Sequence, residues 1–116
     1  MFSHMSNIAV IDYMEDFCCG AALDWCEAEI KHDYAKSIEQ FEQRYGSLEK
    51  YSGVMIHFGV EKQKIEINTL ERIAKENPHL KIAIGTNSAS DYNFYPEDFA
   101  IIGWKNTEKI KEYFKI

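Results

Sequence analysis

Four polar or ionisable side chains each come directly after an apolar run of the chain. They are Asp12, His57, Thr86 and Lys105. An imidazole in such a place can titrate near neutrality or hydrogen-bond to its neighbours, and a lysine can form a fixed ion pair with the carboxylate of Asp12. We treat these four residues as a candidate site, provided that the fold brings them together.

The runs that precede these residues have the composition of buried parallel strands. Each is short and almost wholly apolar, which is typical of strands covered on both faces. We expect strands at residues 7–12, 53–58, 80–85 and 99–104, and a weaker one at 30–35.

Segments with apolar residues at helical spacing separate the strands. They cover residues 16–29, 37–45 and 65–74, and a last helix, capped by Asn106 or Thr107, has Ile110, Tyr113 and Phe114 facing inward. The alternation predicts an α/β fold, doubly wound, with a parallel sheet, right-handed crossovers and helices on both faces. Such folds bind ligands beyond the carboxyl ends of the strands, where the four candidate residues are expected.

The stretch between the last two strands lacks helical periodicity and contains Pro96. We therefore expect the fourth helix to be short or absent. A loop there would expose Tyr92, Phe94 and Tyr95 or lay them over the sheet edge. With Trp104 they form either an aromatic contact surface for a partner or a roof over the core.

Length and composition fit one folded domain. The chain has 116 residues, of which 46% are hydrophobic and 28% charged, enough for a core without disulfides. We set residues 1–5 apart as a vector remnant or disordered start and assign 6–116 to a single domain.

A net charge of −6 argues against nucleic acid as a partner. No apolar run approaches the roughly 20 residues of a membrane span, so we expect no membrane contact and a cytoplasmic protein.

The cysteines Cys18, Cys19 and Cys26 lie close together. Their odd number does not suit a disulfide framework and fits a reducing compartment. No Cys-x-x-Cys pair is present and the histidines are scattered, so we expect no metal and no cofactor. The cysteines are expected to be buried or half-buried on a helix.

From residue 6 to residue 116 the order of these features resembles the receiver domains of bacterial response regulators. Receivers of two-component systems place an acidic pair after the first strand, a phosphoacceptor Asp after the third, a Thr or Ser after the fourth and a Lys after the fifth. Asp12, His57, Thr86 and Lys105 occupy those positions in order. The resemblance implies a flavodoxin-like (βα)5 three-layer sandwich with sheet order 2-1-3-4-5.

The sequence departs from receivers where their chemistry takes place. His57 stands at the position of the phosphorylated Asp, and Tyr13 replaces the second acid of the pair. A neutral imidazole serves a magnesium site poorly and differs from a carboxylate as a nucleophile. The chain therefore resembles an atypical receiver, or pseudo-receiver, that keeps the fold without phosphorylation of an aspartate.

The resemblance also implies a function. Receivers use the face of the fourth strand, the fifth strand and the last helix for dimers and outputs. We therefore expect a signalling domain that is not an enzyme and that acts through protein–protein interaction, with a protein partner or a homodimer at that face.

The alternative is a flavodoxin-like binder of a small ligand, or a small enzyme. It would use the carboxyl ends of the strands, with His57, Thr86, Asn87 and Ser88 as contacts. A phosphate-bearing cofactor favours a glycine-rich or Ser/Thr-rich loop after the first strand. Residues 14–17 are acidic in this chain, which disfavours an anion there.

Overall fold

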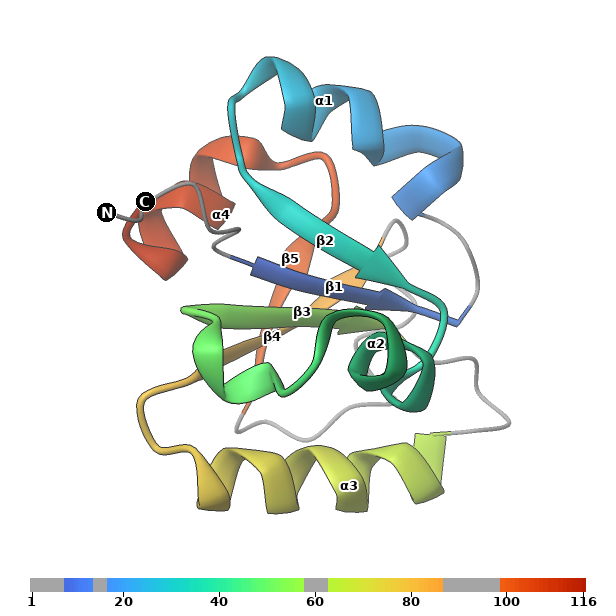
Figure 1. The fold of residues 1–116 in the computed structure, drawn as a ribbon. Helices are drawn as coiled ribbons and strands as arrows, with labels where there is room; N and C mark the ends of the chain where they lie inside the picture. The colour runs from blue at the N-terminus through green and yellow to red at the C-terminus, as the bar shows by residue number, and fades with distance from the viewer. Residues whose placement is uncertain (1–7, 14–16, 58–62, 87–98) are drawn as a thin grey trace.

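The computed structural model describes residues 8–13, 17–57, 63–86 and 99–116, apart from the side chains of 18, 19 and 63–67. The described residues form a five-stranded parallel sheet with helices on both faces (Figure 1). The strands follow the order β2-β1-β3-β4-β5. The predicted α/β class and sheet order are confirmed.

The strands lie within the predicted runs or within one residue of them. They are β1 (Ile8–Asp12), β2 (His32–Ala35), β3 (Gly53–His57), β4 (Lys81–Thr86) and β5 (Ala100–Gly103). Every residue of β1 and β3 is buried, as expected for central strands covered on both faces. Residues of β2 and β5 are mostly half-buried, because these two strands form the edges of the sheet.

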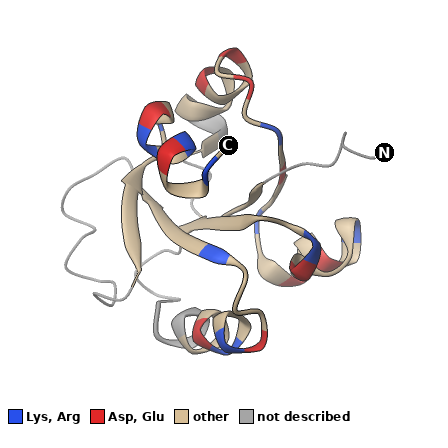
Figure 2. Cartoon of the chain, turned by 90° about the vertical axis from the view of Figure 1, so that its left-hand side faces the viewer, with Lys and Arg blue, Asp and Glu red and all other residues tan. Residues whose placement is uncertain are grey.

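The helices make the two outer layers. They are a π-helix η1 (Phe17–Ala21), α1 (Ala22–Glu27), α2 (Ile38–Tyr45), a 3-10 helix η2 (Leu48–Lys50), α3 (Gln63–Glu76) and α4 (Thr107–Phe114). Figure 1 shows α1 and α4 over one face of the sheet and α2 and α3 over the other. Figure 2 shows that the charged residues lie mainly on the helices, while the strands carry few.

Local sequence signals set the ends of α2 and α4. The Ser37 hydroxyl accepts the Gln40 N–H at 3.0 Å and caps α2. Gly46 ends the same helix with φ at 91°, a left-handed conformation that glycine adopts without a Cβ clash. Asn106 caps α4 by accepting the Lys109 N–H at 3.2 Å. These caps fix where each helix leaves the sheet.

The core has one part on each face of the sheet. The part beneath α2 and α3 is mainly aliphatic, whereas the part beneath α1 and α4 contains Phe17, Trp25 and Trp104. The Phe17 ring lies 4.9 Å from the Trp25 ring and 5.3 Å from the Trp104 ring. The Trp25 Nε1–H donates to the Trp104 carbonyl at 2.6 Å. Aromatic packing of this kind fixes η1 and α1 against the end of β5.

The first helical segment differs from its prediction. One helix was expected at 16–29, whereas η1 leads into α1, which ends at Glu27. The wide turn includes Gly20, a poor helix former. Cys26 is exposed, so the prediction of buried or half-buried cysteines is wrong at this position, since α1 turns Trp25 inward instead. The side chains of Cys18 and Cys19 lie outside the described residues.

Two predictions fall on segments that the structure does not describe. The short or absent fourth helix concerns residues 87–98, and the vector remnant or disordered start concerns residues 1–5. Within the described ranges, every helix is too short or too polar to span a bilayer.

Candidate functional site at the strand ends

Asp12 and His57 lie side by side at the carboxyl ends of β1 and β3. The two strands pair in parallel with Asp12 opposite His57, so both side chains leave the sheet on the same face. Asp12 Oδ1 lies 3.6 Å from His57 Nδ1. Asp12 is fully buried and His57 is 6% exposed. The fold thus brings two of the four candidate residues into a close, buried pair.

The second oxygen of Asp12 is engaged by the backbone. Oδ2 accepts the Phe17 N–H in a buried bond of 2.6 Å. Phe17 is the first residue of η1, so Asp12 satisfies one of the N–H groups that a helix start leaves without a partner. A buried carboxylate needs such partners, because burial of an uncompensated charge is costly. Asp12 therefore anchors η1 to the end of β1.

Thr86, the last residue of β4, and Lys105, which follows β5, lie in different environments. Thr86 is buried, and its carbonyl accepts the Trp104 N–H at 3.0 Å. Lys105 is exposed and lies along η1, where a Cβ on Gly20 would be 3.0 Å from Lys105 Cε. The ion pair of Lys105 with Asp12 considered from the sequence is not formed among the described residues. The glycine leaves the space that the lysine side chain fills.

Trp104 belongs to the core. Its side chain has no exposed surface and packs 5.3 Å from the Phe17 ring. The prediction that Trp104 contributes to an aromatic partner surface is therefore wrong, and its role as a roof over the core is confirmed. The other members of that predicted surface, Tyr92, Phe94 and Tyr95, lie outside the described residues.

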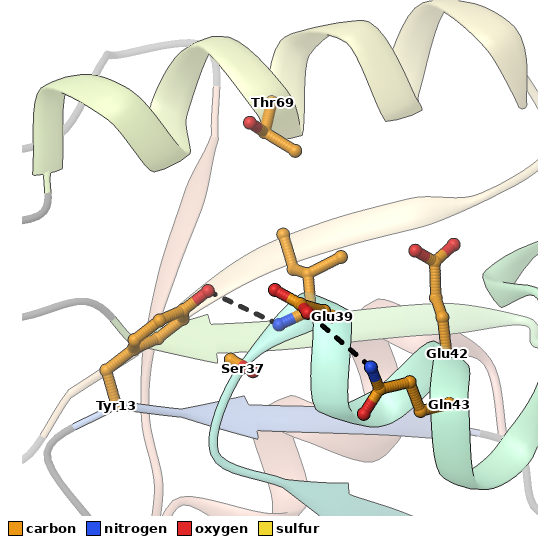
Figure 3. Close-up of a pocket in the computed structure, with 7 residues that line it drawn as sticks. Tyr13, Ser37, Glu39, Glu42, Gln43 and Thr69 are labelled. Atoms are coloured by element: carbon orange, nitrogen blue, oxygen red, sulfur yellow. Dashed lines mark hydrogen bonds between the residues drawn. The ribbon is translucent and has the colours of Figure 1, made fainter.

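Tyr13 is also part of the site at the strand ends. From the sequence it was noted only as the residue that replaces the second acid of the receiver pair. Its backbone N–H donates to the His57 carbonyl at 3.0 Å, and its hydroxyl accepts the N–H of Ile38, the first residue of α2, at 3.3 Å. Tyr13 thus ties the strand ends to α2. It also borders a cavity of about 630 Å³ between α2 and α3 (Figure 3). Other side chains at this cavity are Ser37, Glu39, Glu42, Gln43 and Thr69.

Among the described residues, the strand ends present one carboxylate and one imidazole as possible metal ligands. No group of three or more His, Cys, Asp and Glu side chains suited to a metal occurs in the part of the chain that the structure describes. Asp12 and His57 supply one carboxylate and one imidazole, and the carboxylate already accepts a backbone N–H. Mg²⁺ prefers a near-octahedral set of oxygen ligands, which this pair does not match. Asn87 and Ser88, contacts of the ligand-binding alternative, lie outside the described residues.

The sheet order and the layers define a flavodoxin-like α/β domain. Two solved structures from Burkholderia are similar to it. One is described as the pilus assembly protein CpaE of Burkholderia thailandensis E264, with a TM-score of 0.67 and 17% identity over 97% of this chain and 100% of that chain. The other is a pilus assembly-related protein of Burkholderia pseudomallei K96243, with a TM-score of 0.66 and 16% identity over 99% of this chain and 93% of that chain.

At such low identity these similarities show the fold alone. No protein-family model and no curated protein sequence matches the chain. What the domain does must therefore be argued from its own residues.

Proposed function

We propose that the chain is a cytoplasmic pseudo-receiver, a receiver-like signalling domain that is not phosphorylated on an aspartate and is not an enzyme. It works by binding a protein partner. The observation that carries the proposal is the buried contact of 3.6 Å between Asp12 and His57 at the end of the two central strands.

This contact matters because of the chemistry that it replaces. An acyl phosphate forms on a carboxylate nucleophile, with a hard cation held by oxygen ligands beside it. In this chain His57 stands at the nucleophile position, and Asp12 lies 3.6 Å from its Nδ1 while accepting the Phe17 N–H. An imidazole thus takes the place of the acceptor carboxylate, and among the described residues the one carboxylate beside it, Asp12, already accepts a backbone N–H.

The partner is proposed to dock on the face formed by β4, β5 and α4, as the resemblance to receivers implies. The strand β5 is an edge of the sheet, and edge strands and their flanking helices are common sites of association. Both structural neighbours are described as proteins of pilus assembly, a process that depends on contacts between proteins. A homodimer through the same face is the simplest symmetric arrangement.

The proposal is tested by thermal unfolding with Mg²⁺ and beryllofluoride, an analogue of the phosphoryl group. A ligand that binds the native state raises Tm by mass action. The Tm of this domain is expected to stay within about 1 °C of its value in buffer. A rise of several degrees that needs both Mg²⁺ and beryllofluoride would show a working acceptor site and overturn the proposal.

A further inference from the structure

A groove separates α2 from α3 on the face of the molecule away from α1 and α4. It consists of the cavity of about 630 Å³ beside Tyr13 and a second cavity of about 270 Å³ nearer Asn77. The cavities adjoin, because Ile38 and Glu42 line both of them. Since α2 has eight residues, the groove is about 12 Å long, enough for about two turns of helix or four extended residues.

Carboxylates dominate the walls of this groove. Among the described side chains, Glu39, Glu42, Glu49 and Glu76 line it from both sides, against the single guanidinium of Arg72. All five side chains are exposed. Figure 3 shows the Glu42 side chain projecting from α2 toward α3. A concave surface lined by one sign of charge concentrates the electrostatic potential and attracts the opposite charge.

Two cations near α2, Arg44 and Lys50, are hydrogen-bonded to backbone carbonyls. Arg44 donates to the Tyr34 carbonyl at 3.4 Å, and the Lys50 ammonium donates to the Tyr45 carbonyl. Across the described ranges, none of the four groove carboxylates forms an ion pair with a Lys, Arg or His side chain. The negative charge is therefore available to a partner.

Apolar side chains border the groove below the acids. Ile38, Leu48 and Ile73 line it and are at most 8% exposed. Lysine and arginine have alkyl stems that lie on apolar surface while their charged ends reach a carboxylate. We propose that the groove between α2 and α3 is a second docking surface, which binds a lysine- and arginine-rich segment of a partner protein. This surface is separate from the face of β4, β5 and α4.

The probe for this surface is a short fluorescent peptide of alternating lysine and leucine, measured by fluorescence anisotropy with the full chain. We expect saturable binding that weakens as salt rises from about 0.05 M to 0.3 M, because salt screens exposed charges. A peptide in which glutamate replaces lysine is expected not to bind.

Charge reversals locate the binding surface. Two charge reversals are tested, Glu42→Lys on α2 and Glu76→Lys on α3. Each is expected to lower the affinity for the basic peptide about tenfold. Glu112→Lys is the matched control, because Glu112 is also exposed but lies on α4, and its effect is expected to stay within about twofold.

Thermal unfolding of each variant first shows whether it folds. The two groove substitutions lie on different helices, so the binding test can use either variant if the other fails to fold. A loss of binding in a groove variant that exceeds the loss in Glu112→Lys supports the proposal. Absence of saturable binding by the wild-type chain, or equal losses in groove and control variants, overturns it.

Discussion

At the level of single residues, Asp12 has the most demanding environment in the site. It is fully buried, and its two carboxylate oxygens face different partners, the His57 imidazole and the Phe17 N–H. The residue that begins a magnesium site in receivers thus serves here to hold η1 to β1. Its contribution to stability can be separated into charge and hydrogen bonding by two substitutions.

Asp12→Ala is expected to lower the free energy of unfolding by about 2–4 kcal/mol, because it leaves the buried Phe17 N–H without an acceptor. Asp12→Asn keeps an oxygen for that N–H and is expected to cost about 1–2 kcal/mol. Urea denaturation monitored by circular dichroism measures both values. Equal and small losses in the two variants would show that the bond to Phe17 contributes little.

His57→Asp restores the carboxylate that receivers carry at this position. Two acids then lie side by side at the ends of β1 and β3, and like charges in one buried site repel. The variant is expected to be less stable than wild type without metal and to gain Tm with millimolar Mg²⁺, since a carboxylate pair suits this ion. The wild-type chain is the control and is expected not to respond. A similar Mg²⁺ response in both proteins would mean that His57 is irrelevant to the metal.

At the level of elements, close packing at the end of β4 depends on a missing side chain. A Cβ on Gly85 would lie 2.4 Å from the Trp104 ring, which has no exposed surface and no room to move. On the neighbouring strand β5, a Cβ on Gly103 would meet nothing nearer than 3.7 Å. The two glycines therefore form a matched pair for a test of this packing.

Gly85→Ala is expected to lower the free energy of unfolding by about 2–3 kcal/mol through overpacking. Gly103→Ala is expected to change it by less than about 0.5 kcal/mol. Chemical denaturation of both variants gives the comparison. If the two losses were equal, the position of Trp104 against β4 would be in error.

Elements with strong periodicity could be predicted from the sequence, and irregular ones could not. The buried strands β1 and β3 are nearly continuous apolar runs, so both were predicted to within one residue at each end. Apolar spacing predicted a helix across the π-helix η1 but not its wide turn, because that turn depends on contacts with Asp12, Trp25 and Trp104. The burial of Trp104 could not be predicted either. A tryptophan that follows a strand can face the core or a partner, and contacts from distant parts of the chain decide between them.

For the whole molecule, the titration of two tyrosines, Tyr51 (buried) and Tyr113 (half-buried), predicts how stability depends on pH. Burial raises the pKa of Tyr51 well above its ordinary value, as does the hydrogen bond that its hydroxyl donates to Asp33 Oδ2 at 2.6 Å. Burial also raises the pKa of Tyr113. A tyrosine whose pKa is higher in the folded state than in the unfolded state stabilises the fold while it stays protonated. This contribution is complete below the unfolded pKa, about 10 for tyrosine, and is lost as the pH rises further.

The free energy of unfolding is therefore expected to fall as pH rises above about 10. Tyr51→Phe is expected to be less stable near pH 8, because the bond to Asp33 is lost, and to show a shallower decline at alkaline pH. Some decline is expected to remain through Tyr113. Urea denaturation between about pH 8 and pH 11 measures the slopes, and an unchanged slope in Tyr51→Phe would contradict the assignment.

The parts of the site that depend on strand order could be predicted from the sequence, and the parts that depend on contacts between distant residues could not. The meeting of Asp12 and His57 followed from strand order and register, which periodicity and the resemblance to receivers supply. The place of Lys105 beside Gly20 and the link from Tyr13 to α2 did not follow, because both depend on side-chain directions after the strands end. The acidic groove depends on two helices that are separate in the sequence, so spacing along the chain gives no sign of it.

Intact mass spectrometry of the full chain tests the claim that this domain is not phosphorylated. The chain is incubated with acetyl phosphate and Mg²⁺ and analysed without acid, so that a phosphohistidine would also survive. An unchanged mass is the predicted result, because an imidazole, His57, stands where receivers carry the acceptor carboxylate, and the Asp12 carboxylate accepts the buried Phe17 N–H. A mass increase of one phosphoryl group that is lost in Asp12→Ala or His57→Ala would contradict it.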